Sequence, residues 1–160
     1  MENIQIKSIE GDLLYEHTCE HNTLKRTLEK AVKEGANLEW AVLVKADLEG
    51  AILEGARLAW AVLEEANLKR ANLERASLEW ANLEGANFEG AILFKADIEG
   101  AGLGKANLIQ ANLIQVNFRR ADLGGADFTG ANTFRAKGLP TGLSKQEKHN
   151  GKHSDKKHRR

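Results

Sequence analysis

The large apolar residues in the middle of the chain recur at every fifth position, a spacing that fits neither an α-helix nor a β-strand. A Leu, Ile or Phe stands at each such position from Leu38 to Phe128, nineteen times without an insertion. An α-helix would rotate successive members of this set by about 140° and would spread them around its whole surface. The backbone therefore has to turn by a constant angle in each unit, which predicts a solenoid.

A small residue accompanies each of these large residues, which we call the centres of the units. Two places before the centre stands Ala, with Val116 as the one exception. A large and a small apolar side chain at fixed spacing suit the close packing of a narrow core. The residue directly before the centre is Asn or Asp in twelve of the nineteen units. Because these short side chains hydrogen-bond to nearby backbone in turns, we interpret them as structural and assign them no catalytic or metal-binding role.

The repeated unit, roughly Ala-(Asn/Asp)-Leu-x-x, resembles the unit of the pentapeptide-repeat proteins over residues 36 to about 131. The resemblance implies an all-β solenoid, the right-handed quadrilateral β-helix, in which four units form one coil of twenty residues. Residues 36–135 would then form about five coils, about 24 Å long at ~4.8 Å per layer. In this family the centres point inward, so one column of the core would consist of Leu38, Leu58, Leu78, Ile98 and Phe118.

Residues 1–35 do not follow the repeat and predict a separate end structure. Two short polar-apolar segments flank residues 8–11, which indicates a hairpin with Gly11 in its turn. Asn22 or Thr23 is a candidate N-cap for a helix that runs to Lys33 and stops at Gly35. Because the first coil of a solenoid has an unpaired edge and an open interior, we expect this helix to be its cap.

The repeat is expected to break at residues 131–134, where Thr133 stands at a centre and Phe134 follows it. Residues 136–160 form a basic segment with three His and without apolar periodicity, so we expect a disordered tail. Such a tail is expected to be a solvated segment, with weak, nonspecific nucleic-acid contact as an alternative. Its His residues match no metal-ligand pattern.

Three tryptophans twenty residues apart would form an outward column on the solenoid. Trp40, Trp60 and Trp80 each stand two places after a centre, and Gly100 and Arg120 end the series. Exposed aromatic groups often mark contact sites, so this column is the candidate partner surface. The alternative is that a terminus or a neighbouring basic side chain covers it.

A second apolar column follows one place after the centres of another face, in the last coils. It consists of Phe94, Ile114 and Phe134, where Glu54 and Glu74 hold the equivalent earlier positions. The change from acidic to apolar residues suggests a contact between two copies, which would be isologous by symmetry. The equal alternative is that residues 138–140 fold back over this column.

Acidic residues recur directly after the centres, as at Glu64, Glu84 and Glu89. Some members of the family, the quinolone-resistance proteins, are thought to imitate duplex DNA with acidic rods and to bind DNA gyrase. A mimic needs a sustained negative potential, whereas Lys and Arg residues interrupt these faces here. A DNA-mimicking modulator of gyrase is therefore the alternative function.

The sequence offers no constellation for catalysis, and no cofactor or metal site is expected. All five His lie outside the repeat, and no nucleophile elbow, zinc-protease helix or phosphate-binding loop is present. The single Cys19, the lack of a long apolar run and the lack of a signal-peptide core predict a cytoplasmic protein without membrane contact. The first functional hypothesis is a non-catalytic interaction or scaffold module with a protein partner that the sequence does not identify.

Overall fold

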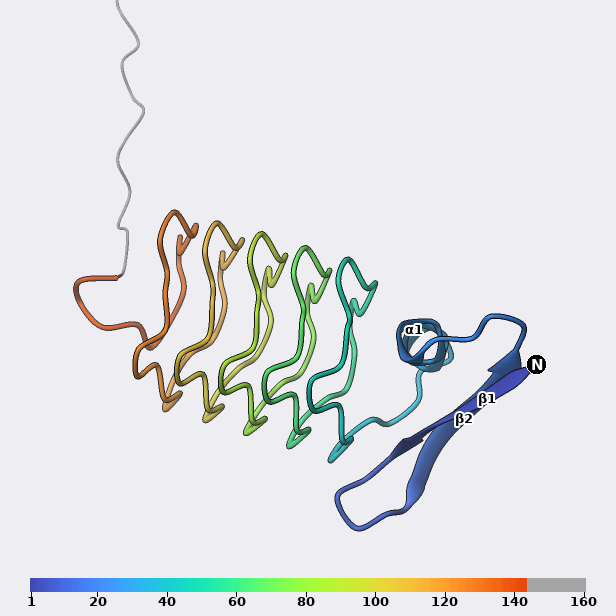
Figure 1. The fold of residues 1–160 in the computed structure, drawn as a ribbon. Helices are drawn as coiled ribbons and strands as arrows, with labels where there is room; N and C mark the ends of the chain where they lie inside the picture. The colour runs from blue at the N-terminus through green and yellow to red at the C-terminus, as the bar shows by residue number, and fades with distance from the viewer. Residues whose placement is uncertain (144–160) are drawn as a thin grey trace, which may run out of the picture.

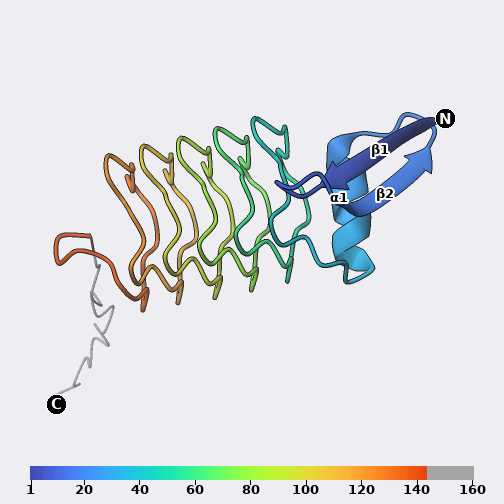
Figure 2. The same cartoon turned by 90° about the horizontal axis from the view of Figure 1, so that it is seen from below.

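The computed structural model describes residues 1–143 and shows a hairpin, one helix and a solenoid in this order (Figure 1). Strand β1 spans Glu2–Lys7, strand β2 spans Leu13–Cys19, and helix α1 spans Leu24–Lys33. The solenoid follows α1, and its coils stack in one direction away from the hairpin (Figure 2). The predicted tail lies, from residue 144 onward, outside the described residues.

Backbone pairing between coils has a period of twenty residues, as expected for a β-helix with four units in each coil. Parallel bridges join residues twenty positions apart, from Asn37 with Arg57 to Asn117 with Lys137. Each centre from Leu38 to Phe118 donates its N–H to the carbonyl nineteen residues further on, for example from Leu58 to Ser77 at 2.8 Å. Every coil is thus held by the next, which is the reason that a solenoid needs several repeats for stability.

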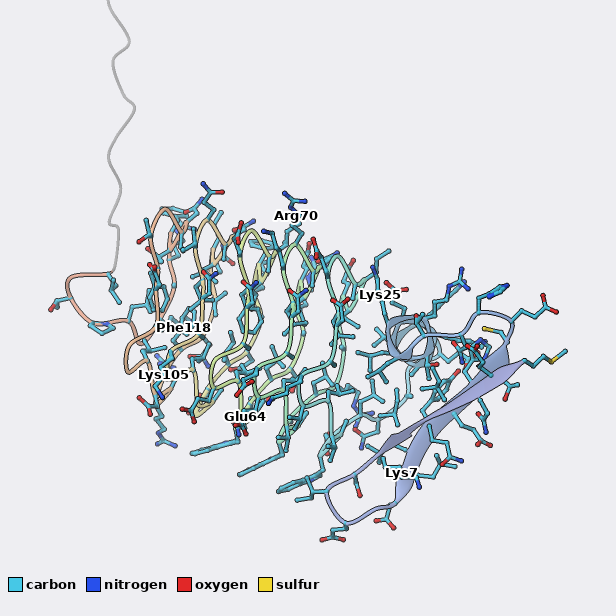
Figure 3. All side chains as sticks on the ribbon, viewed as in Figure 1. Lys7, Lys25, Glu64, Arg70, Lys105 and Phe118 are labelled. Carbon is cyan, nitrogen blue, oxygen red and sulfur yellow. The ribbon has the colours of Figure 1, made fainter. Side chains whose placement is uncertain are left out.

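The core is one continuous column of centres and small residues inside the coils. Among the centres from Leu38 to Phe118, none is more than 1% exposed. The five residues of the expected core column are all fully buried: Leu38, Leu58, Leu78, Ile98 and Phe118. Figure 3 shows Phe118 within the coil and Arg70 projecting from its outer edge. Alternating inward and outward side chains in every unit therefore produce the apolar interior.

The Asn and Asp residues before the centres make the turn bonds that the sequence predicts. All twelve accept, through Oδ1, a hydrogen bond from the backbone N–H two residues later. The structural interpretation of these side chains is confirmed. Some also link coils, because Asn67 donates to Asp47 at 3.0 Å and Asn117 donates to Asp97 at 2.9 Å.

The hairpin closes one part of the first coil's edge through its backbone. Strands β1 and β2 pair antiparallel, and the residue after β1, Ser8, forms an antiparallel bridge with Ala41. Val42 donates its N–H to the carbonyl of Lys7 at 2.9 Å, and Ile9 donates to the carbonyl of Trp40 at 3.1 Å. These bonds replace the partners that an earlier coil would supply.

Helix α1 closes another part of that edge through its side chains. Thr23 is the N-cap and accepts from the N–H of Arg26, and Leu28 and Ala31 are fully buried in the same core as the coils. Lys25 donates to the carbonyl of Glu49 at 2.6 Å, and the carboxylate of Glu29 accepts from the N–H of Ile52 at 2.9 Å. The helix therefore covers the open interior and also pairs with the exposed backbone, as expected for a cap.

A polar contact between β2 and the end of α1 holds the hairpin to the helix. The Tyr15 hydroxyl donates to the Glu34 carboxylate at 2.5 Å, and the Lys30 ammonium donates to the same carboxylate at 2.5 Å. Burial and the hydrogen bond to Glu34 raise the pKa of Tyr15 to about 12. The bonds from Lys30 and Tyr15 lower the pKa of Glu34. The Glu34 carboxylate, which accepts both of these hydrogen bonds, therefore stays charged at neutral pH.

The predicted break of the repeat at residues 131–134 is wrong. Asn132 bridges to Asn112 and Lys137 bridges to Asn117, so the pairing continues through this unit. Thr133 occupies the centre and is only 4% exposed. Its hydroxyl donates to the carbonyl of Leu143 at 3.0 Å, which removes the penalty of a buried polar group at this position.

Candidate functional site

The three tryptophans lie at one corner of consecutive coils, where the backbone has a left-handed conformation. Their φ angles are 65°, 62° and 59° at Trp40, Trp60 and Trp80. The N–H of Trp60 donates to the carbonyl of Glu79 at 2.8 Å, as the backbone of every coil requires. The corner geometry points the indoles outward, and the twenty-residue coil aligns them.

The indoles stack on one another along the axis of the solenoid. The ring centroids of Trp40 and Trp60 are 5.0 Å apart with an interplanar angle of 11°, and those of Trp60 and Trp80 are 5.4 Å apart at 10°. Such pairs contribute about 0.5–1.5 kcal/mol each beyond their buried area. The rings nevertheless remain 41–45% exposed. The column is therefore ordered and still accessible from solvent.

Gly100 lies directly beneath the Trp80 indole, at the C-terminal end of the column. A Cβ atom built on Gly100 would lie 2.6 Å from Cδ2 and Cε3 of Trp80, so the indole covers this glycine. The sequence shows that the series stops at Gly100, but it does not show that the glycine lies beneath the ring. A glycine twenty residues after the last tryptophan is the signal that could have indicated this contact.

We expect Gly100→Ala to displace the Trp80 indole, whereas Gly55→Ala is the matched control. Both glycines have positive φ, 71° and 68°, and no atom lies within 4 Å of a Cβ on Gly55. Alanine in this conformation costs about 1–2 kcal/mol at either position. Gly100→Ala adds about 1–3 kcal/mol of overpacking, which thermal unfolding and a changed tryptophan emission spectrum would report. Equal behaviour of the two variants would contradict the contact.

Exposed aliphatic residues of the hairpin turn and of the first coil, taken together with the column, make up what we call the Trp corner. We define it by its exposed members: Ile9, Trp40, Val42, Val44, Trp60 and Trp80. Each of them is between 41% and 52% exposed. The sequence analysis missed Ile9, Val42 and Val44; the signal at Val42 is an aliphatic residue in the position where Asn or Asp usually makes the turn bond.

A pocket of ≈ 290 Å³ lies at the N-terminal end of the Trp corner, between the hairpin turn and the first coil. Ile9 and Trp40 form part of its wall. Three carboxylate side chains also line it, from Glu10, Asp12 and Glu39. The Trp corner therefore combines apolar surface with negative charge at this end.

The second predicted column is half-buried and has basic neighbours. Phe94, Ile114 and Phe134 are all partly covered. The Lys95 ammonium lies 4.9 Å from the ring centroid of Phe94, and the Arg135 guanidinium lies 5.0 Å from that of Phe134. These cation–π contacts cover part of the two rings, so the column presents positively charged groups beside its apolar surface.

Gly138, at the start of the segment that is the alternative cover for that column, packs on another face. A Cβ on Gly138 would lie 2.5 Å from the backbone nitrogen of Arg119 and 2.6 Å from the carbonyl carbon of Phe118, so the chain packs directly on the last coil at another face. Leu139 packs against the core. These contacts favour a role for the segment in closing the end of the solenoid.

Most carboxylates of the acidic faces are paired with basic residues, which belong to a neighbouring coil in every case except the pair of Glu74 with Arg75. Six of the nine Glu residues that follow the centres form ion pairs of 3.0–3.7 Å, namely Glu39, Glu54, Glu74, Glu84, Glu89 and Glu99. Exposed pairs of this kind contribute at most about 1 kcal/mol each. They do, however, interrupt the negative potential along the rod.

Within residues 1–143 the structure shows no group of three or more His, Cys, Asp or Glu side chains arranged to hold a metal ion. In the same range, no helix has the length and apolar character needed to span a membrane.

Comparison with known proteins identifies the repeat. The model of the pentapeptide repeats matches the chain over residues 34–70, 71–108 and 96–132, with eight copies. No curated protein matches the chain.

Solved structures similar to this chain include two pentapeptide repeat proteins of about the same identity. One, from Nostoc PCC 7120, is 30% identical, with 72% of this chain and 87% of that chain covered and a TM-score of 0.46. The other, from the thylakoid lumen of Arabidopsis thaliana, is also 30% identical, with 56% and 63% covered and a TM-score of 0.35. The plasmid-mediated fluoroquinolone resistance protein QnrB1 is 17% identical, with 59% and 61% covered and a TM-score of 0.38.

The family model and the pairing of the coils agree on the same stretch of the chain, since the matched residues are those in which the bridges recur at twenty-residue intervals. The fold is accordingly the right-handed β-helix of such repeats. This chain belongs to the pentapeptide repeat family.

Proposed function

We propose that this protein is a non-catalytic interaction module whose Trp corner is the surface that contacts a protein partner. The observation that carries the proposal is the ordered stack of three indoles, each more than 40% exposed, beside exposed valines. Exposed contiguous apolar surface of this kind is typical of binding sites. Tryptophan is also among the residue types that contribute most to binding at interfaces.

The rigidity of the site supports the same function. Backbone hydrogen bonds hold each tryptophan to the layers before and after it. At Trp60, for example, the N–H donates to the carbonyl of Glu79 in the next coil, and the carbonyl of the preceding residue, Ala59, accepts from the N–H of Trp40. Stacking on the adjacent ring restricts the indole further. Because this surface is ordered before binding, little of the binding free energy is lost in ordering it.

We expect Trp60→Ala to weaken partner binding by about tenfold or more, with Arg70→Ala as the matched control. Trp60 and Arg70 both occupy corners with positive φ, 62° and 57°, so the two alanines carry the same backbone strain. Loss of a central tryptophan from an interface typically costs about 2 kcal/mol or more. Proteins retained on the immobilised chain would be identified, and their affinity for both variants would be measured by calorimetry.

Two outcomes decide that experiment. Weakened binding by Trp60→Ala and normal binding by Arg70→Ala, with both variants folded at the temperature of the assay, would support the Trp corner. Equal affinities of both variants would remove the Trp corner from the binding surface. In that case the column of Phe94, Ile114 and Phe134 becomes the candidate surface, and sedimentation velocity would show whether it joins two copies.

DNA mimicry directed at gyrase is the weaker alternative, because basic residues of adjacent coils pair with most of the carboxylates. A supercoiling assay separates the two functions. Salt-sensitive inhibition that is lost when Glu64, Glu84 and Glu89 are replaced by Lys would favour mimicry over the module proposed here. No inhibition at high protein concentration would leave the interaction module.

A further inference from the structure

Charge is divided unequally along this chain, although its formal net charge is zero. Residues 1–100 contain 11 basic and 19 acidic side chains, a formal charge of −8. Residues 101–160 contain 12 basic and 4 acidic side chains, a formal charge of +8. Of the second group, residues 144–160, which we call the C-terminal segment, contribute seven Lys or Arg against two acidic residues. The negative part contains the whole Trp corner.

Several carboxylates around the Trp corner form no ion pair within the described residues, although Glu39 at this corner is paired with Arg57 at 3.4 Å. Within residues 1–143, four carboxylates on this side form no ion pair: Glu10, Asp12, Glu64 and Glu79. On another face, by contrast, Arg75 lies 3.7 Å from Glu54 and 3.4 Å from Glu74. Figure 3 shows Glu64 at the edge of the solenoid opposite to Arg70. The Trp corner therefore joins indole surface to unpaired negative charge, which suits a segment rich in Lys and Arg.

The C-terminal segment is long enough to reach this surface. The described chain ends at Leu143, whose carbonyl accepts from the Thr133 hydroxyl in the last coil. Seventeen further residues span up to about 55 Å when extended. The stack of coils is about 24 Å long at ~4.8 Å per layer. Because both sites belong to one chain, the effective concentration of the segment at the Trp corner is on the order of millimolar.

We propose that the C-terminal segment (residues 144–160) binds in cis across the Trp corner and competes with the external partner. This proposal rests on the proposed function, because it assigns a regulation to the same surface. Lys and Arg side chains contact the indoles and the unpaired carboxylates, and the partner has to displace them. Raised salt, or a more strongly acidic competitor for the segment, opens the surface.

Tryptophan fluorescence tests this directly, since all three tryptophans of the chain lie in the Trp corner. Quenching by acrylamide, which is neutral, is measured for the full chain and for a full-length variant in which the seven Lys and Arg of the C-terminal segment are replaced by Ser. We expect the variant to have at least about twofold higher quenching at low salt. The natural chain should reach the same value at ~1 M NaCl, where charges are screened beyond about 3 Å.

Carboxylate variants supply the matched control. Glu64→Gln with Glu79→Gln should release the segment and raise quenching, whereas Glu54→Gln with Glu74→Gln, on another face, should leave it unchanged. Each pair is compared with its own Ser-substituted version, so that a direct effect of the nearby carboxylate on the indoles cancels. Circular dichroism melting confirms that every variant is folded.

Equal quenching of the natural and Ser-substituted chains at low salt would overturn the proposal. Protection that disappears on dilution of the protein would also overturn it, because the segment would then act between two copies. Loss of partner binding in Trp60→Ala together with equal quenching would retain the proposed function and reject only the regulation. Protection by the segment without any effect of Trp60→Ala on a partner would reject the proposed function instead.

Discussion

Replacement of Leu78 with lysine is expected to lower the free energy of unfolding by about 4 kcal/mol or more. Leu78 is a centre in the middle of the solenoid and is fully buried. Its neighbours in the column, Leu58 and Ile98, are fully buried as well, so the ammonium would find no water and no counter-charge. Since each coil pairs with the coils before and after it, the damage extends to both sides.

Ile52→Lys is the control for this prediction, because it introduces the same side chain at an outward position of another unit. Ile52 is 64% exposed, so the change is expected to stay within about 0.5 kcal/mol. Urea unfolding followed by circular dichroism measures both variants. A Leu78→Lys variant as stable as Ile52→Lys would show that the centres do not form the interior.

The solenoid could be predicted from the sequence because its signal is local and repeated. Each unit carries its own large residue, small residue and turn residue, so one error in interpretation is corrected by the other units. The same regularity predicts that Trp40, Trp60 and Trp80 align, since a coil of twenty residues leaves them no other relative position. The stacked rings confirm this geometry. Their role in binding stays a prediction.

Contacts between unlike parts of the chain could not be predicted in this way. The pairing of Glu29 with the N–H of Ile52 joins a helix to a coil, and no repeated pattern records it. Ile9 reaches the Trp corner only because the hairpin turn pairs with the first coil. Thr133 was expected to end the repeat on account of its polarity, but a single hydrogen bond to Leu143 makes it acceptable as a centre. The polarity of a residue does not show whether the fold will provide it with a hydrogen-bond partner.

The capping helix yields the second prediction of large effect: Leu28→Ala is expected to destabilise the protein by about 2–5 kcal/mol. Leu28 is fully buried where α1 covers the interior of the first coil. Removal of its side chain leaves a cavity and loosens α1 above the edge that Lys25 and Glu29 pair with. In a solenoid, stability is a sum of repeat and neighbour terms, so the loss should begin at this end.

Hydrogen exchange with peptide resolution distinguishes this local loss from a general one. In Leu28→Ala, amides of residues 41–57 should lose protection before those of residues 101–118, because the exposed edge of the first coil is freed first. Lys33→Ala, at an exposed site of the same helix, should change stability by no more than about 0.5 kcal/mol and leave both regions protected. Uniform loss of protection along the coils in Leu28→Ala would mean that the solenoid unfolds as one unit and that α1 is not an end cap acting on its nearest coil.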